Sequence, residues 1–302
     1  MQDYATMLWS SPRLRLLQLI CICGWAFAPH RARSQDLVKT DDLLTAEALV
    51  KAQREGEAAL AAFYANVRIS ATMSRRKSFG DASPFTRQHE FYRAGNLLRL
   101  EFTGRISHEG AELDRTRAWV ANKADKSFQV TRLGASGKFA LDEVLPDHVQ
   151  ISDDIFLNAP YSIAPFGFLE MRVSELLAAP GVIFGEVVKG KDDRGDFVTL
   201  HFRRTKFADG TPADVPCWIK FLPDRHWAVA EWSFGKNLPA RGKVEYVDDA
   251  KIPLVKSFHV WIEDKTTGLV HGIEDYQVTS IAVARLPMST FQLESFGIRA
   301  AP

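Results

Sequence analysis

Residues 215–234 read VPCWIKFLPDRHWAVAEWSF, which is the composition of two β-strands around a tight turn. We expect the turn at Leu222-Pro223-Asp224-Arg225. Proline presets the backbone angle φ, and an aspartate side chain can accept a hydrogen bond from the backbone that follows it. The flanking residues are rich in aromatic and β-branched types, which favour strands. The sequence therefore predicts a β-hairpin here, with further strands on either side.

The two faces of this hairpin do not separate into one apolar and one polar face. Alternation places Cys217, Ile219 and Phe221 on one face, but it places Trp218 and Leu222 on the other. A sheet with one face in water alternates more strictly. We therefore expect a sheet that is covered on part of both faces, as when it curls around a helix or a cavity.

The rest of the chain holds about a dozen strand-like runs, and short links join nearly all of them. Links of this length exclude crossover helices between parallel strands. A turn at 264–268 precedes a long strand over 270–283, and residues 174–179 read as a short helix. The predicted fold is mainly β (α+β): a strongly curved antiparallel sheet or unclosed barrel, with an N-terminal helix and short covering helices.

The N-terminal helix is expected over residues 41–64. Asp41 and Asp42 favour its start through capping and the helix dipole. Its apolar stripe includes Leu49, Leu60, Phe63 and Tyr64. Such a helix either packs on the sheet or plugs a cavity.

Residues 1–34 have the pattern of a signal peptide. Basic residues precede an apolar run over 14–28, and Ala32-Arg33-Ser34 supplies small residues for cleavage before Gln35. The alternative is a retained membrane anchor. We expect an exported protein, periplasmic or extracellular, in which residues 35–302 form a single domain without a transmembrane span.

Charge and cysteine content narrow the function classes. The first 34 residues carry four arginines and one aspartate, which leaves 34 basic and 36 acidic residues in the remainder. This balance gives no reason to expect nucleic acid as a partner. Removal of that segment also leaves Cys217 as a lone cysteine, so an internal disulfide is excluded.

A screen for catalytic and metal motifs predicts no catalytic residue, no metal and no cofactor. Neither the zinc motif His-Glu-x-x-His nor a paired Cys-x-x-Cys motif is present. Residues 134–138 (GASGK) lack the glycine spacing of a phosphate loop, and Phe139 follows them where a serine or threonine hydroxyl is needed. The aspartates of 192–196 read as a solvated turn, because Arg194 opposes a cation.

Two further pairs of residues are candidate sites. His259 and His271 could face each other across the turn at 264–268, but a metal would need a third ligand. Glu274 and Asp275 are neighbours on an expected strand, so their side chains should point to opposite faces. That placement is poor for an acid/base pair.

Aromatic residues cluster in the C-terminal half of the chain. They are either core residues or the lining of a ligand pocket. The cavity candidates are Trp218, Trp227, Trp232, Trp261 and Phe258.

The segment 142–164 holds few alternating runs, and residues 151–168 mix apolar residues with proline and glycine. Such a segment is either a loop packed over the core or a lid.

The layout resembles the LolA-like proteins, which are exported lipoprotein carriers and related lipid-binding half-barrels. The resemblance lies in the helix at 41–64, the strand at 67–73, the hairpin around Leu222-Pro223-Asp224 and the ending FQLESFGI at 291–298. It implies a curved antiparallel sheet with helices over its concave face. It transfers no functional residue.

The leading hypothesis is an exported, non-enzymatic protein that binds an apolar or lipid-like ligand in a half-barrel cavity. The first alternative is a partner-binding or envelope-sensing module of the same fold, like the periplasmic regulators of sigma-factor signalling. The second alternative is a hydrolase with an unrecognised site. Lipid retention, partner capture and an activity screen discriminate among the three.

Overall fold

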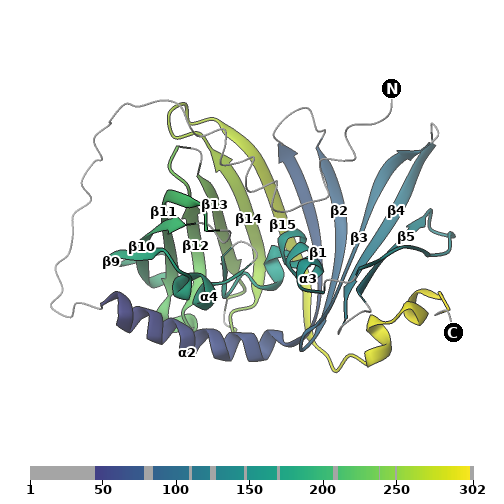
Figure 1. The fold of residues 1–302 in the computed structure, drawn as a ribbon, viewed down its shortest axis with the longest axis horizontal. Coiled ribbons are helices and arrows are strands. Elements are labelled where there is room, and N and C mark those ends of the chain that lie inside the picture. Colours follow the sequence, from purple (N-terminus) through teal and green to yellow (C-terminus); the bar gives the residue numbers. More distant parts are fainter. Residues whose placement is uncertain are drawn as a thin grey trace.

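One large antiparallel sheet dominates the computed structural model (Figure 1). The structure describes residues 45–77, 84–108, 111–122, 127–145, 148–168, 171–206, 210–237, 239–248 and 250–299. Within them the sheet has 13 strands in the order β6-β5-β4-β3-β2-β1-β15-β14-β13-β12-β11-β10-β9. The strands are β1 (Asn66–Lys77), β2 (Phe85–Ala94), β3 (Leu97–His108), β4 (Ala111–Ala121), β5 (Ser127–Leu133), β6 (Ala140–Leu145), β9 (Val182–Asp192), β10 (Gly195–Lys206), β11 (Pro212–Leu222), β12 (Ala228–Phe234), β13 (Ala240–Tyr246), β14 (Val255–Glu263) and β15 (Val270–Val283).

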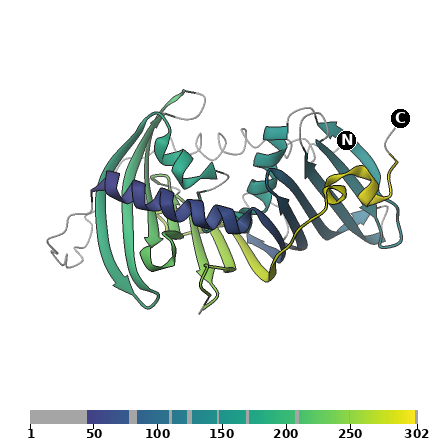
Figure 2. The same cartoon turned by 90° about the horizontal axis from the view of Figure 1, so that it is seen from below.

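The first and last strands of the sheet's sequence lie side by side in its middle. Ile69 of β1 pairs with Phe91 of β2 on one side and with Ile281 of β15 on the other. The remaining strands form a meander in each direction, and β6 and β9 are the two edges. Figure 2 shows the curvature of this open sheet. The predicted fold class is confirmed.

The hairpin predicted from residues 215–234 is β11 and β12, with Ile219 opposite Trp232. Its turn is longer than expected. The single turn of 3-10 helix η3 (Pro223–Arg225) is followed by His226 and Trp227, which have φ values of 56° and 57°. Two consecutive left-handed residues that are not glycine are uncommon, so tertiary contacts must hold this turn.

Helix α2 (Ala46–Tyr64) supplies those contacts. Its N-cap is Thr45, whose side chain accepts a hydrogen bond from the backbone of Ala48. The predicted start at Asp41 and Asp42 lies outside the described residues. At Gly56 the helix comes so close to the turn that a Cβ atom would overlap the carbonyl oxygen of His226. The helix therefore packs on the sheet, and glycine at this position permits the approach.

The segment 142–164 is more regular than expected. It contains the end of β6 and helix α3 (His148–Asn158), which packs on β3 and β4. Residues 159–168 are buried and include the 3-10 turn η2 (Pro160–Ser162). The short strands β7 (Gly167–Phe168) and β8 (Met171–Arg172) then lead into helix α4 (Val173–Ala178), close to the predicted helix. The prediction of an irregular segment was wrong, because Ile151 and Ile155 form a helical apolar pair.

Part of the opposite face of the sheet is also covered. The C-terminal turns η4 (Met288–Phe291) and η5 (Leu293–Phe296) bury Phe291 and Phe296 against β3, β4 and β5. The ring of Phe296 meets that of Phe128 edge to face at 5.9 Å. The sequence predicts a sheet that is partly covered on both faces. The C-terminal turns provide this second cover, but they lie over β3, β4 and β5 and not over the hairpin of β11 and β12.

Candidate functional site: the concave face

The concave face is the face of the sheet on which α2, α3 and α4 pack (Figure 2). Two of the five candidate aromatic residues lie there. Trp232 is 1% exposed and its ring lies 5.1 Å from that of Phe168, while Phe258 lies against Tyr276 at 6.2 Å. Both are packed core residues of a large apolar cluster.

The other three candidates lie elsewhere. Trp218 neighbours Ile219 on β11 and therefore points to the convex face, where it is half-buried. Trp261 also points there and stacks on His259 at 4.9 Å. Trp227 lies in the turn beside α2. The structure thus does not bring the five residues to one cavity, and their role in ligand binding stays a prediction.

The concave face changes character along its strands. At the α2 end it is aliphatic and aromatic, and Tyr64 donates a hydrogen bond to the carbonyl of Pro253 there. The middle holds His89, Tyr161 and Tyr276. At the end away from α2 it carries arginines, as the strand register shows.

The middle zone consists of buried aromatic and imidazole rings, two of which carry a polar atom without a hydrogen-bond partner among the described residues. The ring of His89 lies 6.1 Å from that of Phe102, 6.1 Å from that of Tyr161 and 6.0 Å from that of Tyr276. Among the described residues, neither Nδ1 of His89 nor the hydroxyl of Tyr161 has a hydrogen-bond partner. Burial, followed by the charge of Arg87, lowers the pKa of His89 to about 3. His89 is therefore neutral in the folded protein.

This burial predicts a pH dependence of stability. Because the pKa of His89 is about 3 when folded and about 6.5 when unfolded, the unfolded chain binds the proton. The free energy of unfolding is therefore unaffected by the titration of His89 above about pH 6.5, and it falls as the pH drops from about 6.5 toward about 3. From about pH 6.5 to about pH 5.5 the loss should be about 1 kcal/mol. Urea unfolding should show that slope in the wild type but a smaller one in His89→Phe; equal slopes would contradict the placement.

Four arginines form the zone away from α2, which we call the arginine belt: Arg75, Arg87, Arg115 and Arg117. Arg87 lies opposite Met73 and Arg117 lies opposite Phe102, so these side chains share the concave face with core residues. The belt spans β1, β2 and β4, and β3 contributes Gly104 between them.

Gly104 explains how Arg87 reaches across β3. A Cβ atom at Gly104 would lie 3.0 Å from Cγ of Arg87, so the arginine stem occupies the space above this glycine. The guanidinium lies over the ring of Phe85 at 4.4 Å and over that of Phe102 at 5.3 Å. These cation–π contacts hold the guanidinium group of Arg87 against the two aromatic rings.

Sequence reasoning missed the arginine belt. Its four residues come from three strands, and Arg75 and Arg117 are 42 positions apart in the sequence. The alternation of Arg115 and Arg117 on one strand was a usable signal. Their meeting with Arg87 depends on strand register, which the sequence does not display.

The pair Glu274 and Asp275 and the pair His259 and His271 can both be placed from the strand register. Glu274 pairs with Arg75 on the concave face, whereas Asp275 pairs with Arg76 and His259 on the convex face. The expected opposite orientation is confirmed. His259 lies opposite Asp275 in the register, so it does not face His271 across the turn.

The aspartates of residues 192–196 do not form a cation site. Burial acts to raise the pKa of the Asp192 carboxyl, but its hydrogen bonds and ion pairs with Lys220 and Arg194 together lower that pKa below its usual value. The described part of the chain holds no group of three metal-ligating side chains.

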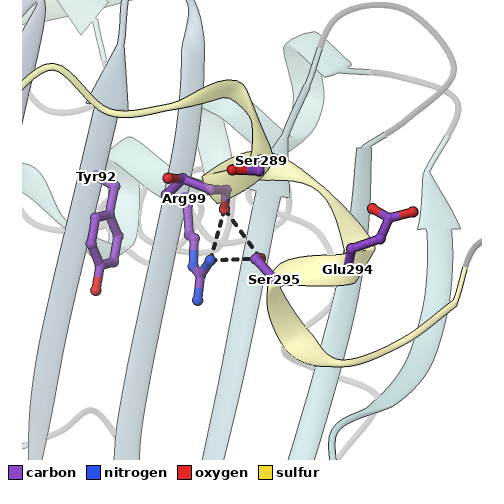
Figure 3. A pocket seen from close by; sticks show the side chains of 6 residues that line it. Tyr92, Arg99, Ser289, Glu294 and Ser295 are labelled. Carbon is purple, nitrogen blue, oxygen red and sulfur yellow. Dashed lines mark hydrogen bonds between the residues drawn. The ribbon is translucent and has the colours of Figure 1, made fainter.

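A hollow of about 360 Å³ lies on the convex face beside the C-terminal turns (Figure 3). Tyr92 and Arg99 line one side, and Ser289, Glu294 and Ser295 line the other. Arg99 donates to the carbonyl of Thr290 at 2.7 Å and to Oγ of Ser295 at 2.8 Å. Since Arg99 also pairs with Glu101, it holds the C-terminal segment in place.

A second hollow of about 670 Å³ lies at the rim between β1, β2 and β15. Convex-face residues such as Arg76 and Asp275 line most of it. Arg75 and Phe85 also line it, so it adjoins the arginine belt.

Comparison with known proteins gives matches by structure. No family model and no curated protein sequence matches the chain. It is similar to a LolA superfamily protein from Nitrosomonas europaea, with 11% identity, a TM-score of 0.40 and coverage of 83% of this chain and 99% of the other. It is also similar to a DUF1329 family protein from Desulfovibrio piger, with 10% identity, a TM-score of 0.39 and coverage of 82% and 98%.

A looser match is MucB in complex with MucA(peri), with 11% identity, a TM-score of 0.14 and coverage of 78% and 100%. The LolA superfamily structure is one of the solved structures that the chain resembles over most of its length. These matches concern the fold, and they assign no ligand. No helix in the described ranges is both long and apolar enough to cross a membrane.

Proposed function

We propose that this chain is an exported, non-enzymatic binding protein that holds an apolar or lipid-like ligand on its concave face. Residues 1–34 serve as the signal peptide and residues 35–302 as a single binding domain in this proposal. One observation carries it. The covering helices bury the α2 end of the concave face, whereas apolar side chains toward the other end are only half-buried.

Half-buried side chains form the proposed contact surface for the ligand: Phe85, Val260 and Ile262 toward the end away from α2, and Trp119 on β4 at the level of Ile69. Register places them on the concave face, because Val260 lies opposite Gly242 and Trp119 lies opposite Leu100. Burying apolar surface contributes about 25 cal/mol per Å², so an acyl chain laid along these residues gains affinity by removing them from water.

The test is native mass spectrometry of the protein recovered from a bacterial periplasm, followed by solvent extraction. We expect discrete extra mass that extracts as lipid, and an N-terminus at Gln35. An empty protein whose melting temperature does not rise when lipids are added would contradict ligand binding. A retained N-terminus would contradict the signal-peptide part of the proposal only.

A second candidate function, binding of an envelope protein, rests on the edges of the sheet. Strand β9 is 11 residues long and forms one edge within the described residues, and its Ile183 is 57% exposed. The opposite edge, β6, exposes 53% of Val144. Exposed edges of this kind can accept a strand from a partner. Replacing Ile183 by lysine should abolish partner capture while leaving lipid retention unchanged.

A further inference from the structure

We propose that the arginine belt binds the anionic headgroup, a phosphate or a carboxylate, of an amphiphile whose apolar part lies on the concave face. This inference rests on the proposed function, because it specifies the chemistry of the ligand that the concave face holds. It makes the ligand class an anionic amphiphile, as distinct from a neutral lipid.

The first support is the imbalance of charge within the belt. Glu274 neutralises Arg75, with Nε of the arginine 2.9 Å from the carboxylate, and Tyr276 donates to the other oxygen of Glu274 at 2.9 Å. Asp142 acts on Arg115 from a distance. Within the described residues, Arg87 and Arg117 form no ion pair with a carboxylate. In the described part of the chain, these two guanidinium groups of the belt therefore lack a counter-charge.

The second support is an unmet hydrogen bond. Nε of Arg117 is buried and has no acceptor among the described residues. A buried donor without a partner is costly, and arginine forks match the geometry of phosphate and carboxylate oxygens. An anion at the belt would supply the missing acceptor.

The third support is the mutual repulsion of the arginines within the belt. The pKa of Arg87 is lowered to about 10, mainly by burial and then by the charges of Arg75, Arg115 and Arg117. The fold holds these like charges together on packed strands, with Gly104 making room for Arg87. A bound anion would relieve the repulsion, so binding is favoured by the site as built.

The position of the belt fits an amphiphile. The guanidinium of Arg87 rests on Phe85 and Phe102, and Phe102 in turn contacts Trp119 edge to face at 5.3 Å. The charged groups therefore lie directly beside the half-buried apolar surface. A headgroup at Arg87 would leave its acyl chain over Trp119 and the neighbouring strands.

Calorimetric titration of the full chain tests this inference with three probes: decyl phosphate, 1-decanol and inorganic phosphate. The variant is Arg87→Gln combined with Arg117→Gln. The control is Arg203→Gln, an exposed arginine on β10 that pairs with Asp214. We expect the wild type and the control to bind decyl phosphate about tenfold or more tightly than decanol. The double variant should lose that preference while its affinity for decanol stays unchanged, since charge-assisted hydrogen bonds provide the difference.

The other outcomes separate the two proposals. Equal binding of decyl phosphate and decanol, unaffected by the double variant, would overturn the headgroup site and leave the proposed function standing. Binding of inorganic phosphate as tight as that of decyl phosphate, without decanol binding, would show a free-anion site and overturn both. Melting temperatures of all variants check folding, and relief of repulsion predicts that the double variant is not less stable than the control.

Discussion

Replacing Trp232 by alanine should lower the free energy of unfolding by about 3–5 kcal/mol, the range for truncating a buried aromatic side chain. Trp232 is 1% exposed and packs on Phe168. Its ring also lies on the backbone of Gly242, where a Cβ atom would overlap it. We expect the cavity left by the truncation to close only in part, because Gly242 belongs to the regular strand β13 and Phe168 is itself fully buried. Chemical denaturation at neutral pH measures the change.

Trp218→Ala is the matched control for Trp232. It lies one residue from Ile219 on the facing strand, but it points to the convex face and is half-buried. We expect a loss of about 1 kcal/mol, in line with partial burial. Comparable losses in the two variants would show that the concave and convex faces are assigned wrongly.

Glu57→Ala should lower the free energy of unfolding by about 2–4 kcal/mol. This buried carboxylate accepts hydrogen bonds from Nε2 of Gln53 at 2.8 Å, from the backbone N–H of Ser174 at 2.9 Å and from Oγ of Ser174 at 2.6 Å. Its removal leaves one buried donor, on Gln53, and two half-buried donors, on Ser174, without their acceptor. Because Ser174 lies at the start of α4, Glu57 fastens this short helix to α2 over the concave face.

Two comparisons sharpen the Glu57 experiment. Glu55→Ala removes a carboxylate from the exposed side of the same helix and should change stability by less than about 0.5 kcal/mol. Hydrogen exchange should show faster opening of α4 in Glu57→Ala, because its N-terminus loses an anchor. Unchanged exchange in α4 would contradict the role assigned to Glu57.

Local patterns predicted much of this fold. The strand over 270–283, the short helix near 174–179 and the hairpin in 215–234 are confirmed because each depends on neighbouring residues. The extended turn of the hairpin was not predicted. Its left-handed His226 and Trp227 are held by the approach of α2 at Gly56, which is a tertiary contact.

The candidate site was less predictable than the fold. Alternation along one strand already separates Phe258 from Trp261, and the register confirms that they lie on opposite faces. It does not show which of the two faces is concave. The arginine belt depends on the pairing of β1 with β2 and of β3 with β4, and these registers bring distant residues together. The role of Gly104, which leaves room for the side chain of Arg87, could not be predicted without this register.

Fluorine NMR of the chain labelled with fluorotryptophan tests the central claim most directly. The claim is that an acyl chain lies on the concave face beside Trp119. The added ligand is a fatty acid that carries a nitroxide near its methyl end, and tryptophan-to-phenylalanine variants assign the signals. We expect selective broadening of Trp119, while Trp218 and Trp261 on the convex face keep their line widths. Broadening of Trp218 or Trp261 instead, or of no tryptophan, would contradict the account.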